Sequence, residues 1–323
     1  MTVTLPSGHS LYHGQISGIL NEYAQTQEDF IGMKIFTPVP TDAETDYFWR
    51  VAEGELTKTP ESLRAPGTKY NREGLALTQD SYATRERGLE SPVDDRKSKT
   101  LERFFSLRET LAKIRALEIM RATEIEIRDA VLNATNFPTG GTFGLNVSNN
   151  WTSIANGTPI SDIIAGKEAI VGKTGLEPDT LVVSYKVYLY LFLNAQVREA
   201  LGIKYQAESL GATFPIELLA NHLGLKRILF SKLKYNSTPN NPTATLTSIW
   251  TDTQAFLCKA GETTDLTEMC VGRTISWEPD GGLFAAEEYR DETVRGNVVR
   301  ARNDTAIKLI SADCGFRFTN VAA

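Results

Sequence analysis

A long helical pattern runs through residues 94–133, and it is clearest where residues 104–120 read FFSLRETLAKIRALEIM. Apolar side chains recur there every three or four residues, as one face of an α-helix requires. Asp94 and Asp95 stand at its start, where carboxylates suit the positive end of the helix dipole. At about 1.5 Å per residue, the pattern predicts a single rod about 60 Å long, which is long for a compact enzyme of this size. The apolar positions are Phe104, Leu107, Leu111, Ile114, Leu117 and Met120.

A long polar hairpin is predicted just before this helix. Residues 47–51 read YFWRV, and the chain returns from Leu75 to Arg87 after an excursion rich in Pro, Gly and charged residues. Residues 47–90 contain seven Lys and Arg against seven Asp and Glu. Such a ribbon has little to bury by itself, because isolated two-stranded ribbons are marginal in water.

The second half of the chain predicts a body of the α+β class. Pro159 follows Thr158 at a first helical position, and Gly175 ends that helix. A buried strand at residues 180–184 and a helix over residues 185–201 come next. The chain then continues in short β-like runs and ends in a strand pair. These runs cover residues 227–231, 255–258, 274–277, 298–302, 305–311 and 315–318.

Composition and charge narrow the class of protein. The chain has 323 residues, of which 41% are hydrophobic and 23% charged, so it is globular and holds roughly two domains or one large unit. Its net charge of −6 argues against binding to nucleic acid through overall charge. The N-terminal 20 residues contain no Lys or Arg, and no run of 18 apolar residues occurs, so neither a signal peptide nor a membrane span is predicted. Three widely spaced cysteines favour a reducing compartment: Cys258, Cys270 and Cys314.

No catalytic, cofactor-binding or metal-binding residue is predicted. The stretch GKEAIVGKT at residues 166–174 has five residues between its glycines, one more than a phosphate loop, and it closes a helix instead of opening one. His9 and His13 lack a third metal ligand, and His222 has no evident nucleophile partner. We interpret the adjacent acids Glu287 and Glu288 as solvated charge. The aromatic residues near 185–205 favour core or interface packing over base stacking.

The N-terminal segment and the hairpin are the two regions that cannot bury themselves. Residues 1–46 contain one short predicted helix, Gly14 to Ala24, and otherwise show no clear periodicity of apolar residues. Segments of this kind are either disordered or covered by neighbouring copies in an obligate assembly. The aromatic start and the balanced charge of the hairpin disfavour disorder.

This order of segments resembles the major capsid proteins of tailed bacteriophages with the Hong Kong 97 type fold. The resemblance covers nearly the whole chain and depends on five short stretches taken in order. They are RAPGT at residues 64–68, DSY at 80–82, VDDR at 93–96, Trp151 before PISDI at 159–163, and GLEPDTLV at 175–182.

The resemblance implies an α+β capsid fold and a division of the chain into five parts. These are an N-terminal arm (1–46), an extended E-loop hairpin (47–92), a spine helix with part of the peripheral domain (93–150), an axial domain (151–300), and C-terminal strands returning to the peripheral domain (301–323).

It also implies a structural role and no enzymatic activity. The expected function is self-assembly as pentamers and hexamers into an icosahedral shell around double-stranded DNA, in the virion and, during assembly, in the host cytoplasm. The implied partners are other copies of the chain, a portal protein, a separate scaffolding protein, an optional decoration protein and, weakly and non-specifically, packaged DNA. Because no long charged coiled-coil segment precedes the arm, the resemblance implies either a separate scaffolding protein or a mature chain that has already been trimmed. No membrane and no cofactor are expected. The alternatives are a cytosolic α/β enzyme, or a phage tail or decoration protein.

Intersubunit contacts are expected along the E-loop. We expect Trp49 to anchor its root, and its basic side chains to meet carboxylates of an adjacent subunit; no covalent cross-link is predicted. The basic residues are Arg64, Lys69, Arg72, Arg85 and Arg87.

Overall fold

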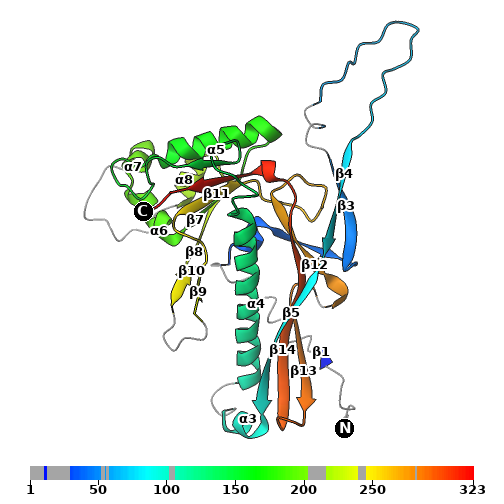
Figure 1. Cartoon of the computed structure of the whole chain (residues 1–323), viewed down its shortest axis with the longest axis vertical. Coiled ribbons are helices and arrows are strands. Elements are labelled where there is room, and N and C mark those ends of the chain that lie inside the picture. Colours follow the sequence, from blue (N-terminus) through cyan, green and yellow to red (C-terminus); the bar gives the residue numbers. More distant parts are fainter. Residues whose placement is uncertain are drawn as a thin grey trace.

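Two β-sheets and their helices organise the chain, and two narrow hairpins project from them (Figure 1). The computed structural model describes residues 11–12, 30–51, 55, 58–101, 106–202, 216–238, 245–280 and 282–323. The short helix expected at residues 14–24 lies outside the described residues, as do His9 and His13.

The first sheet has six strands in the order β1-β13-β14-β12-β2, with β5 pairing along the other side of β14. Only β2 pairs in parallel, with β12, and this edge strand reads TPVPT. The strands are β1 (Leu11–Tyr12), β2 (Thr37–Thr41), β5 (Arg85–Asp94), β12 (Gly272–Trp277), β13 (Ala285–Asp291) and β14 (Gly296–Leu309).

One long helix, α4 (Leu107–Val131), packs along this sheet. Its buried Ala112, Ala116 and Ile119 join Val299 and Ala301 of the sheet in one apolar cluster. Small alanines allow the helix to lie close to the strands.

The expectation of a single helix over residues 94–133 is wrong. Asp94 accepts hydrogen bonds from the backbone N–H groups of Arg96 and Lys97, so it caps a separate short helix, α3 (Asp95–Leu101). Helix α4 starts anew after Ser106, whose backbone is extended. Figure 1 shows α3 at the foot of α4. With 25 residues, α4 is about 38 Å long.

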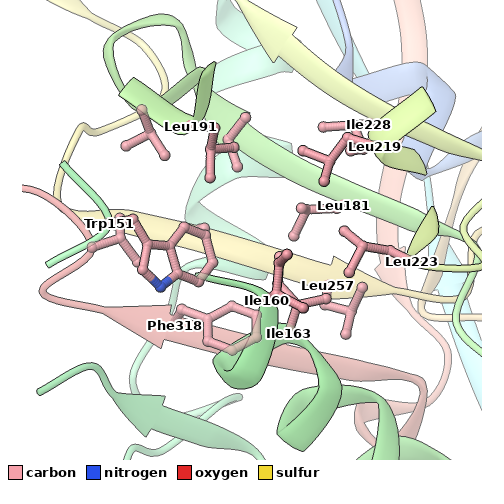
Figure 2. Close-up of a cluster of buried hydrophobic side chains, with 14 of the residues drawn as sticks. Trp151, Ile160, Ile163, Leu181, Leu191, Leu219, Leu223, Ile228, Leu257 and Phe318 are labelled. Carbon is pink, nitrogen blue, oxygen red and sulfur yellow. The ribbon is translucent and has the colours of Figure 1, made fainter. Parts of the chain in front are cut away.

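The second sheet has five strands in the order β6-β15-β11-β7-β8. Its core includes Trp151, which is fully buried, lies 5.1 Å from the Phe318 ring and donates to Asp162 Oδ2 at 2.8 Å. Figure 2 shows this Trp among side chains of the helices and strands. The elements are β6 (Gly144–Asn146), β7 (Thr180–Ser184), β8 (Arg227–Ser231), β11 (Gln254–Cys258), β15 (Gly315–Thr319), α5 (Pro159–Thr174), α6 (Tyr185–Leu193), α7 (Ala195–Ala200) and α8 (Ile216–His222).

A second apolar cluster joins the two sheets. Ile127 and Val131 at the end of α4 meet Val182 and Phe256 of the five-stranded sheet. The carboxylate of Glu124, one turn earlier, accepts hydrogen bonds from the backbone of helix α2 (Gly32–Ile35) and from Trp250 Nε1 at 2.7 Å. Smaller elements are the ribbon of β9 (Lys234–Asn236) and β10 (Leu246–Ser248), and the 3-10 turns η2 (Glu278–Asp280) and η3 (Ala312–Cys314).

Two further expectations fail, each for a local reason. The helix expected over residues 185–201 breaks at Asn194, whose side chain accepts from the N–H groups of Gln196 and Val197 and so caps α7. The expected C-terminal strand pair does not form, because β14 lies in the six-stranded sheet and β15 in the five-stranded one. Residue 300, the boundary expected between the axial domain and the C-terminal strands, lies within β14, and the division of the chain into domains stays a prediction.

Candidate assembly surface

The long hairpin predicted from the sequence is present and projects beyond both sheets (Figure 1). Strands β3 (Thr45–Val51) and β4 (Leu77–Ala83) pair antiparallel, with Trp49 opposite Gln79. Residues 58–79 are all exposed, and residues 58–76 form neither helix nor strand. Residues 58–76 therefore have no core of their own.

One face of the hairpin root docks on the six-stranded sheet. Phe48 and Tyr82 are 5% and 6% exposed and pack with Ile275 and Ile310. On the same face, Arg50 Nη1 donates to the carbonyl of Ile310 at 2.6 Å. These contacts fix the direction in which the hairpin leaves the body.

An ion pair supports this docked face. Lys308 Nζ lies 2.7 Å from Asp80 Oδ1. Although burial favours the neutral acid, the hydrogen bonds from Lys308 and from the Ser81 N–H hold the pKa of Asp80 below its usual value. Asp80 is therefore ionised at neutral pH and pairs with β14 as a carboxylate.

Trp49 does not anchor the root, contrary to our expectation. Side chains alternate between the faces of a strand, so Trp49 points away from the face that carries Phe48, and it is 50% exposed. Tyr47 is 65% exposed and Leu77 is 46% exposed on the same outward face. The sequence analysis did not identify Phe48 and Tyr82 as the docked residues, because alternation predicts only that Phe48 and Trp49 point to opposite faces.

The basic residues expected on the E-loop fall into two groups. Lys69 and Arg72 are exposed in the tip, where the Arg64 guanidinium also lies 4.3 Å from the Tyr70 ring centroid. Arg85 and Arg87 instead belong to β5, which pairs with β14 in the body. Their expected place on the hairpin is therefore wrong.

Arg87 is already used within the subunit. It forms an ion pair with Glu126 of α4 and donates to Thr305 Oγ1 at 3.4 Å. Arg85 is exposed at the start of β5, opposite Thr305. The structure thus brings Arg64, Lys69 and Arg72 together on the tip, and Trp49 near it, but separates Arg85 and Arg87 from them.

The adjacent acids of β13 are not solvated charge, contrary to our interpretation. Glu287 and Glu288 are 7% and 8% exposed and point to opposite faces. Glu287 pairs with Arg302 at 2.8 Å, and Glu288 pairs with Arg108 of α4 at 2.9 Å. They hold strands and helix together, because a buried carboxylate needs a partner.

The stretch GKEAIVGKT lies in α5 and ends it, as expected. Gly175 has a φ of 69°, the left-handed backbone that favours glycine after a helix. Lys173 lies 3.5 Å from Asp313 and over the Phe143 ring. In the described part of the chain, no group of three or more His, Cys, Asp or Glu is placed to bind a metal ion. No described helix is long and apolar enough to cross a membrane.

Comparison with known proteins gives one related sequence. No family model matches the chain. The major capsid protein of Burkholderia phage BcepMu is 27% identical over 187 residues, which cover 57% of this chain. The match spans 59% of the length of that relative.

Solved structures match over almost the whole chain. A phage-related protein from Bordetella bronchiseptica RB50 has a TM-score of 0.71 at 18% identity, covering 97% of this chain and 98% of the other. The capsid of cyanophage P-SCSP1u has a TM-score of 0.58 at 10% identity, covering 98% and 90%. Likeness at such identities shows the fold alone, and it confirms the fold expected from the sequence.

Proposed function

We propose that this chain, which has the Hong Kong 97 type capsid fold, is a phage major capsid protein that assembles as pentamers and hexamers into an icosahedral shell around double-stranded DNA. The observation that carries the proposal is the projecting hairpin. One of its faces docks through Phe48 and Tyr82, while the other presents Tyr47, Trp49 and Leu77 to solvent. Exposed apolar surface on such a thin ribbon is explained if a neighbouring copy covers it.

The tip adds polar contacts to this surface. Lys58 pairs with Glu73 at 2.8 Å across the tip, which leaves the charges of Lys69 and Arg72 outward. An exposed ion pair contributes only about 0–1 kcal/mol. These residues stabilise a shell because the same weak contact is repeated in every subunit. We propose Trp49, Arg64, Lys69 and Arg72 as intersubunit contacts, and we place Arg87 inside the subunit.

The two sheets suggest a revised division of the chain. We assign the six-stranded sheet with α4 to the peripheral domain, and the five-stranded sheet with α5 to α8 to the axial domain. The E-loop then covers residues 45–83, and β5 returns to the peripheral domain. In this division the peripheral domain takes β12, β13 and β14, while β15 belongs to the axial domain.

The partners follow from the same proposal. A shell of this kind encloses DNA, and a net charge of −6 suits a wall that does not grip a packaged polyanion. The proposal includes scaffolding, portal and decoration proteins as partners. It also places the protein in the virion and, during assembly, in the host cytoplasm.

Replacing the hairpin tip tests it. Residues 58–74 are exchanged for a short Gly-Ser turn, and size-exclusion chromatography with negative-stain microscopy compares the variant with the parent chain. We expect the parent to form capsomers or closed shells, and the variant to give folded free subunits with an unchanged circular dichroism spectrum. The matched control exchanges residues 292–295, the exposed turn between β13 and β14, and keeps assembly.

Three outcomes would contradict the proposal. A parent chain that stays monomeric under all assembly conditions would favour the enzyme alternative. Shells that form equally well without the tip would remove the hairpin from the interface. Particles that contain protein cargo and no nucleic acid would contradict the DNA-enclosing role.

A further inference from the structure

Helix α5 carries apolar side chains beyond the face that packs on the sheet. Ile163, Gly166 and Ile170 face the five-stranded sheet and are buried. Ile164 and Val171 lie seven residues apart on one flank of the helix, and they are 47% and 38% exposed. Exposed apolar side chains that share one stripe of a helix mark a surface that a partner can cover.

A groove of about 500 Å³ runs along this outward stripe and the end of α8. Ile160, Ile164, Val171 and Leu223 form its apolar lining. Its rim carries two carboxylates and one ammonium group. Glu168 is exposed, whereas Glu177, with a side chain 73% exposed, lies 3.8 Å from Lys167 Nζ, which also donates to the carbonyl of Leu223 at 2.9 Å. The rim is therefore acidic by one charge.

A second outward surface lies on α6 and the end of β8. Its aromatic rings stack: Tyr188 lies 4.1 Å from Phe230 with the rings 7° apart, and Tyr185 lies 6.1 Å from both. Tyr185 and Leu189 are 38% and 46% exposed. We call Tyr185, Tyr188, Leu189 and Phe230 the aromatic patch.

The charge of the aromatic patch is opposite to that of the groove. Lys232 is exposed, and its ammonium lies 5.1 Å from the Tyr185 ring centroid. Lys234 is exposed two residues further on, and Lys186 stands next to Tyr185. A basic aromatic surface and an acidic apolar groove are complementary in both charge and polarity.

The two surfaces lie at opposite ends of the parallel strands β7 and β8. Glu177 and Leu223 precede these strands, whereas Tyr185 and Lys232 directly follow them. Five residues span about 15 Å, so one subunit cannot bring its own patch to its own groove. Figure 1 shows α5 along the top of this unit and α6 at its lower left.

We infer that the groove on α5 and α8 receives the aromatic patch of a second copy of this chain. The contact joins two different surfaces, so it is heterologous, and repetition closes a ring when the rotation permits. The inference rests on the proposed function, since it specifies how copies meet within one capsomer. It is independent of the hairpin, which lies on the other sheet.

Paired cysteines test the contact on the full chain. Val171→Cys and Leu189→Cys are made singly and together; the three native cysteines are buried. After mild oxidation, we expect the double variant to give a non-reducing gel ladder that ends at five or six subunits. Each single variant should stay monomeric, because the contact joins unlike surfaces. A strong dimer from either single variant would overturn the inference.

Charge reversal provides a second test that does not depend on cysteine geometry. Glu168→Lys and Lys232→Glu should each lower capsomer yield several-fold, and the double reversal should restore it to within about two-fold. Glu199→Lys, an exposed reversal on α7, is the matched control and should have no effect. Capsomers that form normally without ladder or rescue would overturn this contact alone, whereas absence of any capsomer from the parent chain would count against the proposed function.

Discussion

Two tryptophans show how differently the five-stranded sheet and the hairpin are stabilised. Trp151 is 0% exposed, packs against the Phe318 ring and donates its indole N–H to Asp162, whereas Trp49 is 50% exposed on a two-stranded ribbon. The first completes the core of its own subunit. The second lies on a surface that the subunit cannot cover. The comparison teaches that the same residue type serves folding in one region and, in our proposal, assembly in the other.

The largest expected effect is on the five-stranded sheet. Trp151→Ala should lower the free energy of unfolding by about 3–5 kcal/mol, because it opens a cavity and removes the indole donor from Asp162. Urea denaturation of the subunit measures it. Trp151→Phe keeps most of the packing and should recover much of the loss. A Trp151→Ala subunit as stable as the parent would contradict the role of Trp151 in stabilising the core.

Phe48→Ala should come next. Phe48 is 5% exposed in a small cluster, so its truncation should cost about 3 kcal/mol at the low end of the range for a buried Phe. Because the docked face holds the hairpin, limited proteolysis within residues 58–76 should also become faster. Unchanged proteolysis would show that the hairpin direction does not depend on this docking.

The loop between β11 and β12 offers a contrast to the hairpin, because its charged side chains find their partners within the same subunit. Although burial favours its neutral form, hydrogen bonds from Thr263, Glu262 N–H and Arg273 hold the pKa of Glu268 at about 2. The stabilising contribution of the carboxylate is therefore complete above the ordinary pKa of 4.5 and is lost as the pH falls towards 2.

Glu268→Gln should accordingly lower the free energy of unfolding by about 1–2 kcal/mol at pH 7, after allowance for solvent screening. The difference from the parent should shrink between pH 4.5 and pH 2, which urea denaturation across this range would show. Glu292→Gln, with a side chain 75% exposed, is the matched control. A difference that grows on acidification would contradict the assignment.

The smallest effect on the subunit is expected at the outward face of the hairpin. Trp49→Ala and Arg72→Glu should each change the free energy of unfolding by less than about 0.5 kcal/mol, as exposed substitutions do. Both should nevertheless reduce the yield of shells, which light scattering during assembly would follow. A large loss of subunit stability for Trp49→Ala would restore it as an anchor of the root.

Local pattern predicted much of the fold. The limits of α5, the buried strand β7 and the two strands of the hairpin all follow from caps, apolar runs and alternation that are visible along the chain. The break at Asn194 could not be foreseen, because a polar side chain in a helical pattern caps a new helix only when the tertiary contacts favour the break. The separate start of α4 after Ser106 has no side-chain cap to signal it.

The candidate surface was predicted less well, for a related reason. Alternation says that Phe48 and Trp49 point to opposite faces, but it does not say which face meets the body. Arg87 looked like part of the hairpin because the turn into β5 at Thr84 carries no Gly or Pro signal. The apolar groove on α5 could not be predicted from the sequence, because the pattern does not say which side of the helix the sheet covers.

The edge strand β2 has a consequence for how a protein made in many identical copies stays soluble. Among the described residues, β2 pairs only with β12, so its other side is an open sheet edge. Alternate residues of a strand direct their N–H groups to the same side, and Pro38 and Pro40 have none. The open side therefore lacks the donors with which an unpaired edge recruits further strands into aggregates. This edge is therefore protected from growing into fibrous sheets when many subunits are crowded together.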